Sequence, residues 1–157
     1  MNGKYIREVL TPDEVLKRLQ PFIPADCAPD LAQSVLPLII ERLFRLDEFE
    51  QLTSFFYREF LPDQVSLTKK SDANHVSAQL QESLAALKEI SVWDTPSIEG
   101  ALRALQEKND WKKSQYFMMI RVAVTGQTAT PPLFETMEVL GQSRTLSRLQ
   151  KALDILR

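Results

Sequence analysis

The sequence predicts an all-α protein, and three observations support this fold class. The 157 residues include only 4 glycines, and the alternation of apolar and polar residues that is typical of half-buried strands is scarce. Apolar residues recur instead at spacings of three and four, as they do on the buried face of a helix. Proline stands with Ser, Thr or Asp where helices would begin. The composition, 44% hydrophobic and 25% charged, is that of a globular chain that can bury a core.

Thr11, Pro12 and Glu14 mark the start of the first predicted helix. The threonine hydroxyl can cap a helix, proline suits its first position, and Glu14 stands at the capping-box position. We expect this helix to end near Leu19, because a proline follows shortly after it.

Two further segments complete a first predicted subdomain. A helix should begin near Pro29, and Pro37 should bend or split it because proline removes one backbone donor. The next helix is predicted over residues 47–60, with a heavily aromatic face that needs a large partner surface. That face would comprise Leu46, Phe49, Leu52, Phe56 and Phe60.

The segment 61–74 is polar and is the best candidate for a boundary between two parts of the chain. It contains Pro62-Asp63 and, a few residues later, Lys69-Lys70, and such stretches are typical of linkers. We therefore predict two helical subdomains, over residues 11–65 and 66–157, with residues 1–10 preceding them.

Five helices are predicted in the second subdomain. One should run over residues 73–90, and Thr95 should cap the next. The apolar run 116–124 fits a buried strand or a helix, and we favour a helix because its surroundings are helical. Thr130 as N-cap and Pro131 at the first position should begin another, which Gly141 would end in the left-handed conformation.

The last helix is predicted to begin at Ser143 and to carry charge on its outer face. Leucines recur along its inner face, while Arg144, Arg148 and Lys151 line the opposite face. We interpret this basic stripe as a solvated face, which is the commoner role of such a pattern.

Arg121 is the one charged residue within the apolar run 116–124. A guanidinium in this position must keep its tip in water or meet a partner such as a carboxylate or a phosphate. From the residues alone, the helix is expected to bury Phe117, Ile120 and Val124 while Arg121 points to solvent.

The sequence contains no motif that is typical of an active site or a metal centre. It has no glycine-rich phosphate loop, no HExxH, no CxxC and no glycine-flanked serine. Cys27 and His75 are the only cysteine and histidine, and they cannot form a disulfide or a His/Cys metal site. We therefore expect neither catalytic residues nor metal ligands.

Charge and hydropathy argue against two further classes, a general RNA coat and a membrane protein. A net charge of −2 gives no general attraction for nucleic acid, so RNA binding would need a local patch. Apolar runs fall short of the roughly 20 residues of a membrane span, and residues 1–9 lack the apolar core of a signal peptide. We expect a cytoplasmic protein without DNA or membrane partners.

Segments far apart in the chain resemble one family, the bacterial glutamyl-tRNA synthetases. Residues 1–23, beginning MNGKYIR, are similar to the region that follows the catalytic half of these enzymes, and residues 122–153 to their final anticodon-binding segment. More specific parts are RLFRLDEF at residues 42–49 and the pattern RxxxTG...TPPLFE...LG at residues 121–141. Together these segments extend over nearly the whole chain.

The resemblance implies the anticodon-binding C-terminal region of a class I aminoacyl-tRNA synthetase, folded as a bundle or cage of helices. Residues 1–10 would be the tail of the stem-contact region, and Met1 an internal methionine of the full enzyme. The HIGH-like and KMSKS-like motifs of the ATP site do not occur. The chain is therefore expected to be an inactive fragment of a glutamate–tRNA ligase, with no cofactor of its own, whereas ATP and Mg would bind the missing catalytic domain.

The resemblance assigns RNA-binding roles to five residues. Arg42 occupies the position of the arginine that reads the third anticodon nucleotide, a cytosine, in members that discriminate tRNA-Glu from tRNA-Gln. Arg121, Thr130, Pro131 and Leu133 match the site for the first anticodon nucleotide, where Leu133 would pack on the base. We interpret the nearby Tyr116 as a core residue, and Lys112 and Lys113 as solvated.

The predicted partner is the anticodon loop of tRNA-Glu, bound by a monomer. Two alternatives remain open at this stage. The chain could be a helical protein-interaction or regulatory module that has kept the fold without RNA recognition, for which the acidic balance is the main support. It could also belong to a non-discriminating enzyme that charges tRNA-Gln as well.

Overall fold

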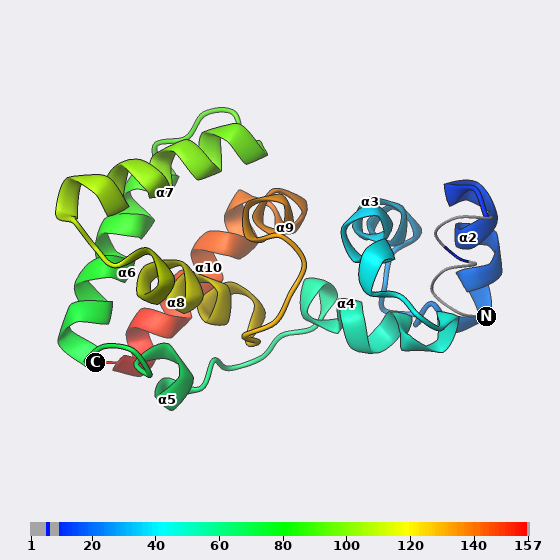
Figure 1. The fold of residues 1–157 in the computed structure, drawn as a ribbon, viewed down its shortest axis with the longest axis horizontal. Helices are drawn as coiled ribbons and strands as arrows, with labels where there is room; N and C mark the ends of the chain where they lie inside the picture. The colour runs from blue at the N-terminus through cyan, green and yellow to red at the C-terminus, as the bar shows by residue number, and fades with distance from the viewer. Residues whose placement is uncertain (1–5, 7–9, 157) are drawn as a thin grey trace. The chain divides into compact units, whose positions relative to one another are not determined.

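The computed structural model describes residue 6 and residues 10–156 of the chain. These residues form helices joined by turns and short connections, and no strand occurs among them (Figure 1). The predicted all-α class is confirmed. The predicted tail over residues 1–10 lies outside the described residues except for Ile6 and Leu10.

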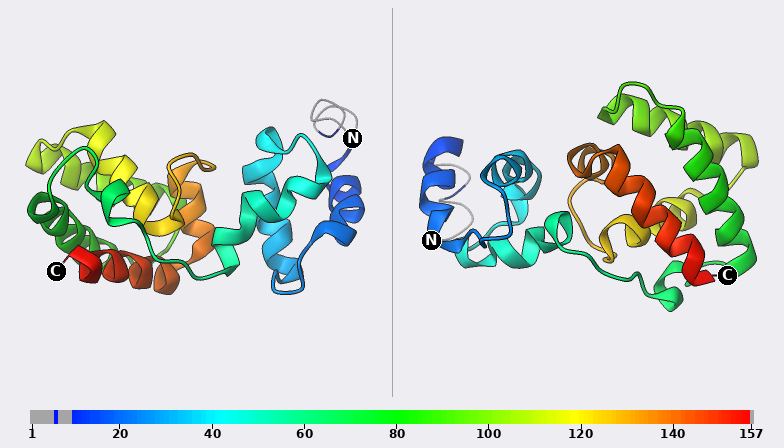
Figure 2. Two further views of the ribbon diagram at one scale, coloured as in Figure 1. Left: turned by 90° about the horizontal axis from the view of Figure 1, so that it is seen from below. Right: turned by 180° about the vertical axis from the view of Figure 1, so that it is seen from behind.

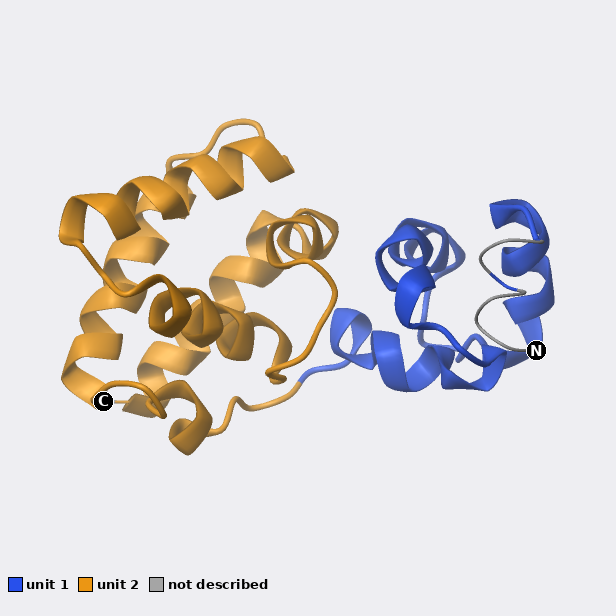
Figure 3. Cartoon of the chain, viewed as in Figure 1, with its two compact units in different colours: residues 1–59 blue, residues 60–157 orange. Residues whose placement is uncertain are grey.

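The chain divides into two compact units, residues 1–59 and residues 60–157 (Figure 3). Each unit has its own set of internal contacts and is described by itself below. The division falls between Glu59 and Phe60, whereas the composition of the sequence pointed to a boundary between residues 65 and 66.

Unit 1 consists of short helices around a small apolar core. Its elements are α2 (Pro12–Leu19), η1 (Gln20–Phe22), α3 (Pro29–Ile39), η2 (Ile40–Arg42), η3 (Leu46–Glu48) and α4 (Phe49–Tyr57). The predicted cap of the first helix is confirmed, because the backbone amide of Glu14 donates to the Thr11 hydroxyl over 3.2 Å. The buried side chains include Val15, Leu19, Val35, Ile39, Leu43, Phe49 and Phe56.

Helix α4 is shorter than predicted. It follows the 3₁₀ turn η3 and ends at Tyr57, where Arg58 adopts an extended conformation. Phe49 and Phe56 are buried on its inner face as predicted. Phe60 lies beyond the helix and has its partners in unit 2, so its assignment to this aromatic face was wrong.

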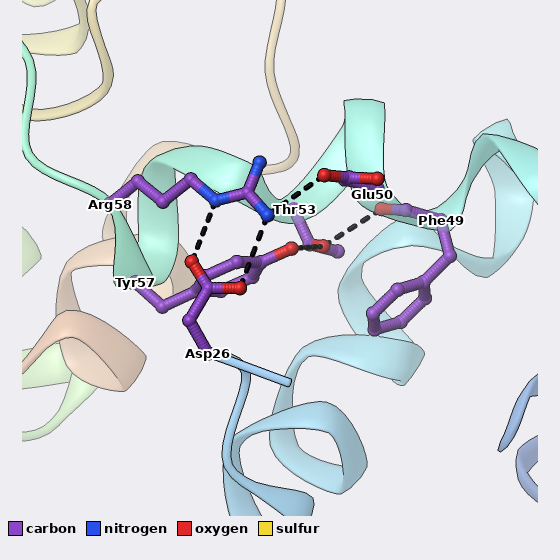
Figure 4. Close-up of polar contacts among 6 residues, drawn as sticks. All are labelled: Asp26, Phe49, Glu50, Thr53, Tyr57 and Arg58. Atoms are coloured by element: carbon purple, nitrogen blue, oxygen red, sulfur yellow. Dashed lines mark hydrogen bonds and ion pairs between the residues drawn. The ribbon is translucent and has the colours of Figure 1, made fainter. Parts of the chain in front are cut away.

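An exposed ion-pair network joins the end of α4 to the connection that precedes α3, as Figure 4 shows. The Arg58 guanidinium donates to both carboxylate oxygens of Asp26, over 2.7 and 3.1 Å, and lies 2.8 Å from a Glu50 oxygen. The hydrogen bond from Arg58 lowers the pKa of the Asp26 carboxyl below its ordinary value. Next to this network, within α4, the Thr53 hydroxyl donates to the Phe49 carbonyl over 2.8 Å.

Unit 2 contains the longer helices and the larger core. Its elements are α5 (Gln64–Leu67), α6 (Ala73–Lys88), α7 (Thr95–Asn109), α8 (Lys113–Thr125), α9 (Leu133–Leu140) and α10 (Gln142–Leu156). Helix α10 packs along α6 and also contacts α8 and α9, as can be followed in Figures 1 and 2. The buried side chains include Val76, Leu80, Leu87, Ile98, Leu102, Ile120, Val124, Met137, Leu149 and Leu153.

The run 116–124 is helical, as predicted, and forms most of α8. Its Tyr116 is fully buried, which confirms its interpretation as a core residue. The Ser83 hydroxyl donates to the Gln79 carbonyl over 2.7 Å and lies 2.5 Å from the Tyr116 hydroxyl. Since serine has a single proton to donate, the Tyr116 hydroxyl is the donor in this pair. Burial raises the pKa of Tyr116 above its ordinary value.

Three predicted helix starts in unit 2 are displaced along the chain. Helix α10 begins at Gln142 rather than at Ser143. Helix α7 is capped by Asp94, one residue before the predicted Thr95, and the Asp94 carboxylate accepts from the Ser97 amide over 2.9 Å. Helix α9 begins at Leu133, with Pro132 in the cap position. Thr130 and Pro131 therefore precede this helix, and their polar groups serve another purpose.

Candidate nucleic-acid interface

The candidate interface is built on the loop that joins α8 to α9, which we call the 126–132 loop. Residues 126–129 are exposed. The loop begins where Gly126 ends α8 with a φ of +72°, a conformation that glycine adopts without a steric penalty. The Thr125 hydroxyl supports this turn, because it donates to the Arg121 carbonyl over 2.6 Å and accepts from the Gln127 amide over 3.1 Å.

Arg121 ties the far end of this loop back to helix α8. Its Nη1 atom donates to the Thr130 hydroxyl and to the carbonyls of Pro131, over 3.1 Å, and Thr130, over 3.5 Å. The side chain is half-buried and bonded to the loop, so the expectation from the residues alone that it simply points to solvent was wrong. The guanidinium is therefore a structural part of the loop, bonded to its residues Thr130 and Pro131.

The structure thus brings together three of the four residues that the resemblance assigned to one site. Arg121 contacts Thr130 and Pro131 directly. Leu133 follows as the first residue of α9, with 5% of its surface exposed. The expectation that Thr130 caps the next helix was wrong, because its hydroxyl accepts from Arg121 and donates to the Pro131 carbonyl over 2.9 Å.

A cluster that the sequence did not indicate supports the other end of the loop. A Cβ atom placed on Gly126 would lie 2.8 Å from the Phe60 ring, so the ring packs directly against the glycine. The Arg148 guanidinium carbon lies 4.8 Å from the centroid of the Phe60 ring. Its Nη1 donates to the Val124 carbonyl over 2.7 Å, in the last turn of α8, where a cation favours the helix dipole.

Arg148 corrects the prediction made for the last helix. It was assigned to a solvated basic stripe, yet only 3% of its surface is exposed. Arg144 and Lys151, its neighbours on that stripe, are half-buried. The basic residue that spacing placed on the outside of α10 is therefore a core residue beneath the 126–132 loop.

Arg42, the fifth predicted RNA-binding residue, belongs to unit 1. It ends the 3₁₀ turn η2 and is half-buried, and no described residue forms an ion pair with it. Phe44, two residues later, is 55% exposed. Sequence reasoning did not single out Phe44, although an aromatic residue between Arg42 and Arg45 is the kind of pattern that single-stranded nucleic acid sites use.

Within the described ranges, the helices are too short or too polar to cross a lipid bilayer. In the same residues, His, Cys, Asp and Glu side chains nowhere gather in threes, as a metal site would require. Lys112 and Lys113 are exposed, as predicted.

The fold is that of a known class of RNA-binding module. The model of the anticodon binding domain family matches residues 14–153, and the chain belongs to this family. Similar curated proteins are glutamate–tRNA ligases. One from Roseiflexus sp. (strain RS-1) is 41% identical over 163 residues, and one from Chloroflexus aurantiacus is 38% identical over 167 residues.

The solved structures agree on the fold. A crystal structure of a glutamate tRNA ligase from Elizabethkingia meningosepticum matches 99% of this chain with a TM-score of 0.87 and 19% identity. The chain covers 31% of that structure. The match to the Roseiflexus relative covers 97% of this chain and 32% of the relative. The match to the Chloroflexus relative covers 98% of this chain and 33% of the relative. It therefore spans about a third of the length of the proteins it matches.

Proposed function

We propose that this chain is the part of a cytoplasmic glutamate–tRNA ligase that binds the anticodon loop of tRNA-Glu. It would hold the tRNA while the rest of the enzyme attaches glutamate in an ATP-dependent reaction. Membership of the anticodon binding domain family and the glutamate–tRNA ligase relatives support this proposal. The protein-interaction alternative has no comparable support.

The observation that carries the proposal is the bonding of Arg121 to Thr130 and Pro131. A flexible loop would have to be ordered when RNA binds, and that ordering would reduce affinity. Here the donor Nη1 and the Thr125 hydroxyl hold the two ends of the 126–132 loop before any ligand arrives. Exposed backbone groups and a nearby positive charge are thus arranged for an unstacked, anionic partner.

In this proposal the first anticodon nucleotide lies against the 126–132 loop, beside Arg121 and Thr130. Leu133 contributes only its small exposed part, since most of it is buried in the absence of RNA. Arg42 of unit 1 reads the third nucleotide, a cytosine, with a planar guanidinium that suits hydrogen bonding to a base edge or stacking on its face. Phe44 supplies an exposed ring for stacking beside it.

Binding of a labelled tRNA-Glu anticodon stem-loop to this chain tests the proposal. Its affinity should be compared at one stated salt concentration with that of the same stem-loop carrying a changed third anticodon base. A bidentate contact between arginine and a base discriminates by about 1–3 kcal/mol, so a preference of about 5-fold to 150-fold is expected.

The three functions that the sequence left open give different results in this titration. Preference for the cognate stem-loop supports a tRNA-Glu module. Equal affinity for tRNA-Glu and tRNA-Gln stem-loops indicates a non-discriminating parent enzyme. Failure to bind either RNA above the level of an unrelated hairpin overturns the proposal and favours a protein-interaction module.

A further inference from the structure

A small pocket lies beside the 126–132 loop, and the function proposed above does not use it. Its volume is about 220 Å³, and its lining includes Met118 and Met119 of α8 and Thr128 of the loop. Ser66, Lys69 and Lys70, within and just after α5, also line it. The pocket lies entirely within unit 2.

The lining combines an apolar wall with positive charge at the rim. Met119 is buried and Met118 is half-buried, whereas Lys69 and Lys70 are exposed. Neither lysine is in an ion pair with a described residue, and no carboxylate is among the described residues that line the pocket. This charge suits an anionic ligand with an apolar face, because methionine packs adaptably against rings and lysine binds phosphate as a point charge.

The position of the pocket relates it to Arg121. Met118 precedes Arg121 by three residues on α8, so the two occupy neighbouring positions on one side of the helix. Thr128 and Thr130 belong to the same loop, and the first lines the pocket while the second accepts from Arg121. A strand that places one base beside Arg121 therefore has its neighbouring nucleotide within reach of the pocket.

We infer that this pocket binds one ribonucleotide adjacent to the anticodon base held beside Arg121. Lys69 and Lys70 contact its phosphate, Met118 packs against its base, and Ser66 and Thr128 offer hydroxyl groups. A volume below the roughly 300–1,000 Å³ that is typical of drug-sized ligands suits a single base. The inference rests on the proposed function, because it requires an RNA on the 126–132 loop.

The phosphate contact is tested with the salt dependence of stem-loop binding. Each phosphate contact to a single strand contributes about 0.7 to the slope of log K against log salt concentration. Because both lysines contact one phosphate, the double variant Lys69→Ala/Lys70→Ala should reduce the slope by about 0.7. Lys112→Ala/Lys113→Ala, at exposed positions outside the pocket, is the matched control and removes the same charge.

The base contact is tested with stem-loops that carry one abasic nucleotide at successive loop positions. Loss of a stacked base should weaken binding by about 5-fold to 100-fold at the position that enters the pocket. In the Met118→Ala variant, the same abasic stem-loop should show a much smaller loss of affinity. Val65→Ala, at an exposed residue of α5 that does not line the pocket, is the control and should behave as the wild type. Circular dichroism melts establish that each variant is folded at the assay temperature.

The outcomes separate the pocket from the function on which it rests. If the wild type does not bind the stem-loop, both the proposed function and the pocket fail. If the wild type binds with the expected base preference while the Lys69/Lys70 pair changes the slope no more than the Lys112/Lys113 pair, only the pocket is overturned. If no abasic position has a smaller effect in Met118→Ala than in the wild type, the pocket is overturned as well.

Discussion

The guanidinium carbon of Arg148 lies 4.8 Å from the centroid of the Phe60 ring, beneath the loop that joins α8 to α9. The two residues are far apart in sequence, and the sequence pattern assigns both elsewhere, Phe60 to the face of α4 and Arg148 to a solvated stripe. Arg148 also donates to the Val124 carbonyl over 2.7 Å. The pair therefore connects the last helix, the first residue of unit 2 and the C-terminal end of α8.

Removing the Arg148 guanidinium should destabilise unit 2. Arg148→Met keeps much of the apolar stem but leaves the Val124 carbonyl without this donor and the Phe60 ring without its cation. Loss of a partner for a buried polar group costs about 1–3 kcal/mol, and a desolvated cation–π contact about 2 kcal/mol. Because contacts made by one side chain do not add fully, we expect a decrease of about 2–4 kcal/mol in the free energy of unfolding, measured by urea denaturation.

Arg144→Met is the matched control, because Arg144 lies on the same helix and is half-buried. A surface substitution of this kind changes stability by about 0.5 kcal/mol or less. If Arg148→Met were no more destabilising than Arg144→Met, the guanidinium would not be the support of the loop that its contacts indicate.

Gly126→Ala should strain the 126–132 loop, and Gly100→Ala is its control. The Gly126 φ is +72°, and a new methyl group would lie 2.8 Å from the Phe60 ring. We expect a loss of about 1–3 kcal/mol in stability and weaker binding of an anticodon stem-loop. Gly100 lies within α7, and a methyl group added there would have no atom within 4 Å, so alanine should stabilise the helix by about 0.5–1 kcal/mol.

Both substitutions are checked by thermal denaturation and by RNA titration. Equal changes in the melting temperature for the two variants would mean that neither the backbone angle nor the Phe60 ring restricts residue 126. A Gly126→Ala variant that loses stability but binds the stem-loop normally would separate the loop from RNA recognition.

The helices could be predicted from the sequence because the signals that mark them are local. The Thr11 cap, the apolar period of α6 and the stop at Gly141 depend on residues within one or two turns. The Gly141 stop was predicted as left-handed, and its φ of +86° with ψ of 158° is positive but extended. Such differences in detail do not change which residues are helical.

The support of the loop could not be predicted because it depends on contacts between distant elements. Arg148 has the spacing of an outer-face residue, and only the approach of α10 to the end of α8 gives its charge a partner. Thr130 and Pro131 have the pattern of a helix start, and the Arg121 guanidinium overrides it. The resemblance assigned Arg121 and Thr130 to one site, whereas the hydrogen bond between them follows from the fold.

Tyr116→Phe should remove one buried hydrogen bond and change the response to alkaline pH. Loss of the bond to Ser83 should cost about 1 kcal/mol at neutral pH. Because burial raises the pKa of Tyr116, the stability that its neutral form contributes is fully present below the unfolded value of about 10. It is lost as the pH rises above about 10 towards the higher folded pKa.

The measurement is the free energy of unfolding as a function of pH, from neutral pH to the highest pH at which the wild type still folds. Above about pH 10, the wild-type curve should fall more steeply than that of Tyr116→Phe, by up to about 1.4 kcal/mol per pH unit. Parallel curves for the two proteins would mean that Tyr116 is accessible to hydroxide in the folded state.

Arg121→Met should loosen the 126–132 loop even without RNA. The Nη1 contacts with Thr130 and Pro131 would be lost, and a hydrogen bond contributes about 1 kcal/mol. Hydrogen exchange of amides in residues 126–130 should therefore accelerate about 5-fold to 10-fold. Lys113→Met, at an exposed position on the same helix, is the control, and equal exchange in both variants would argue against the tie between Arg121 and the loop.

Arg42→Gln should relax discrimination at the third anticodon nucleotide without loosening unit 2. Arg42 lies in unit 1, at the end of η2, so the stability of the 126–132 loop is not expected to change. A bidentate contact between arginine and a base discriminates by about 1–3 kcal/mol, and glutamine lacks both the charge and the planar fork of donors. The ratio of affinities for the cognate and altered stem-loops should fall towards one, mainly through weaker cognate binding.

Arg45→Gln, at an exposed arginine that pairs with Asp47 over 2.9 Å, is the control and should preserve the ratio. If Arg42→Gln reduced the affinity for both stem-loops by the same factor, Arg42 would contribute charge to RNA binding but would not read the base.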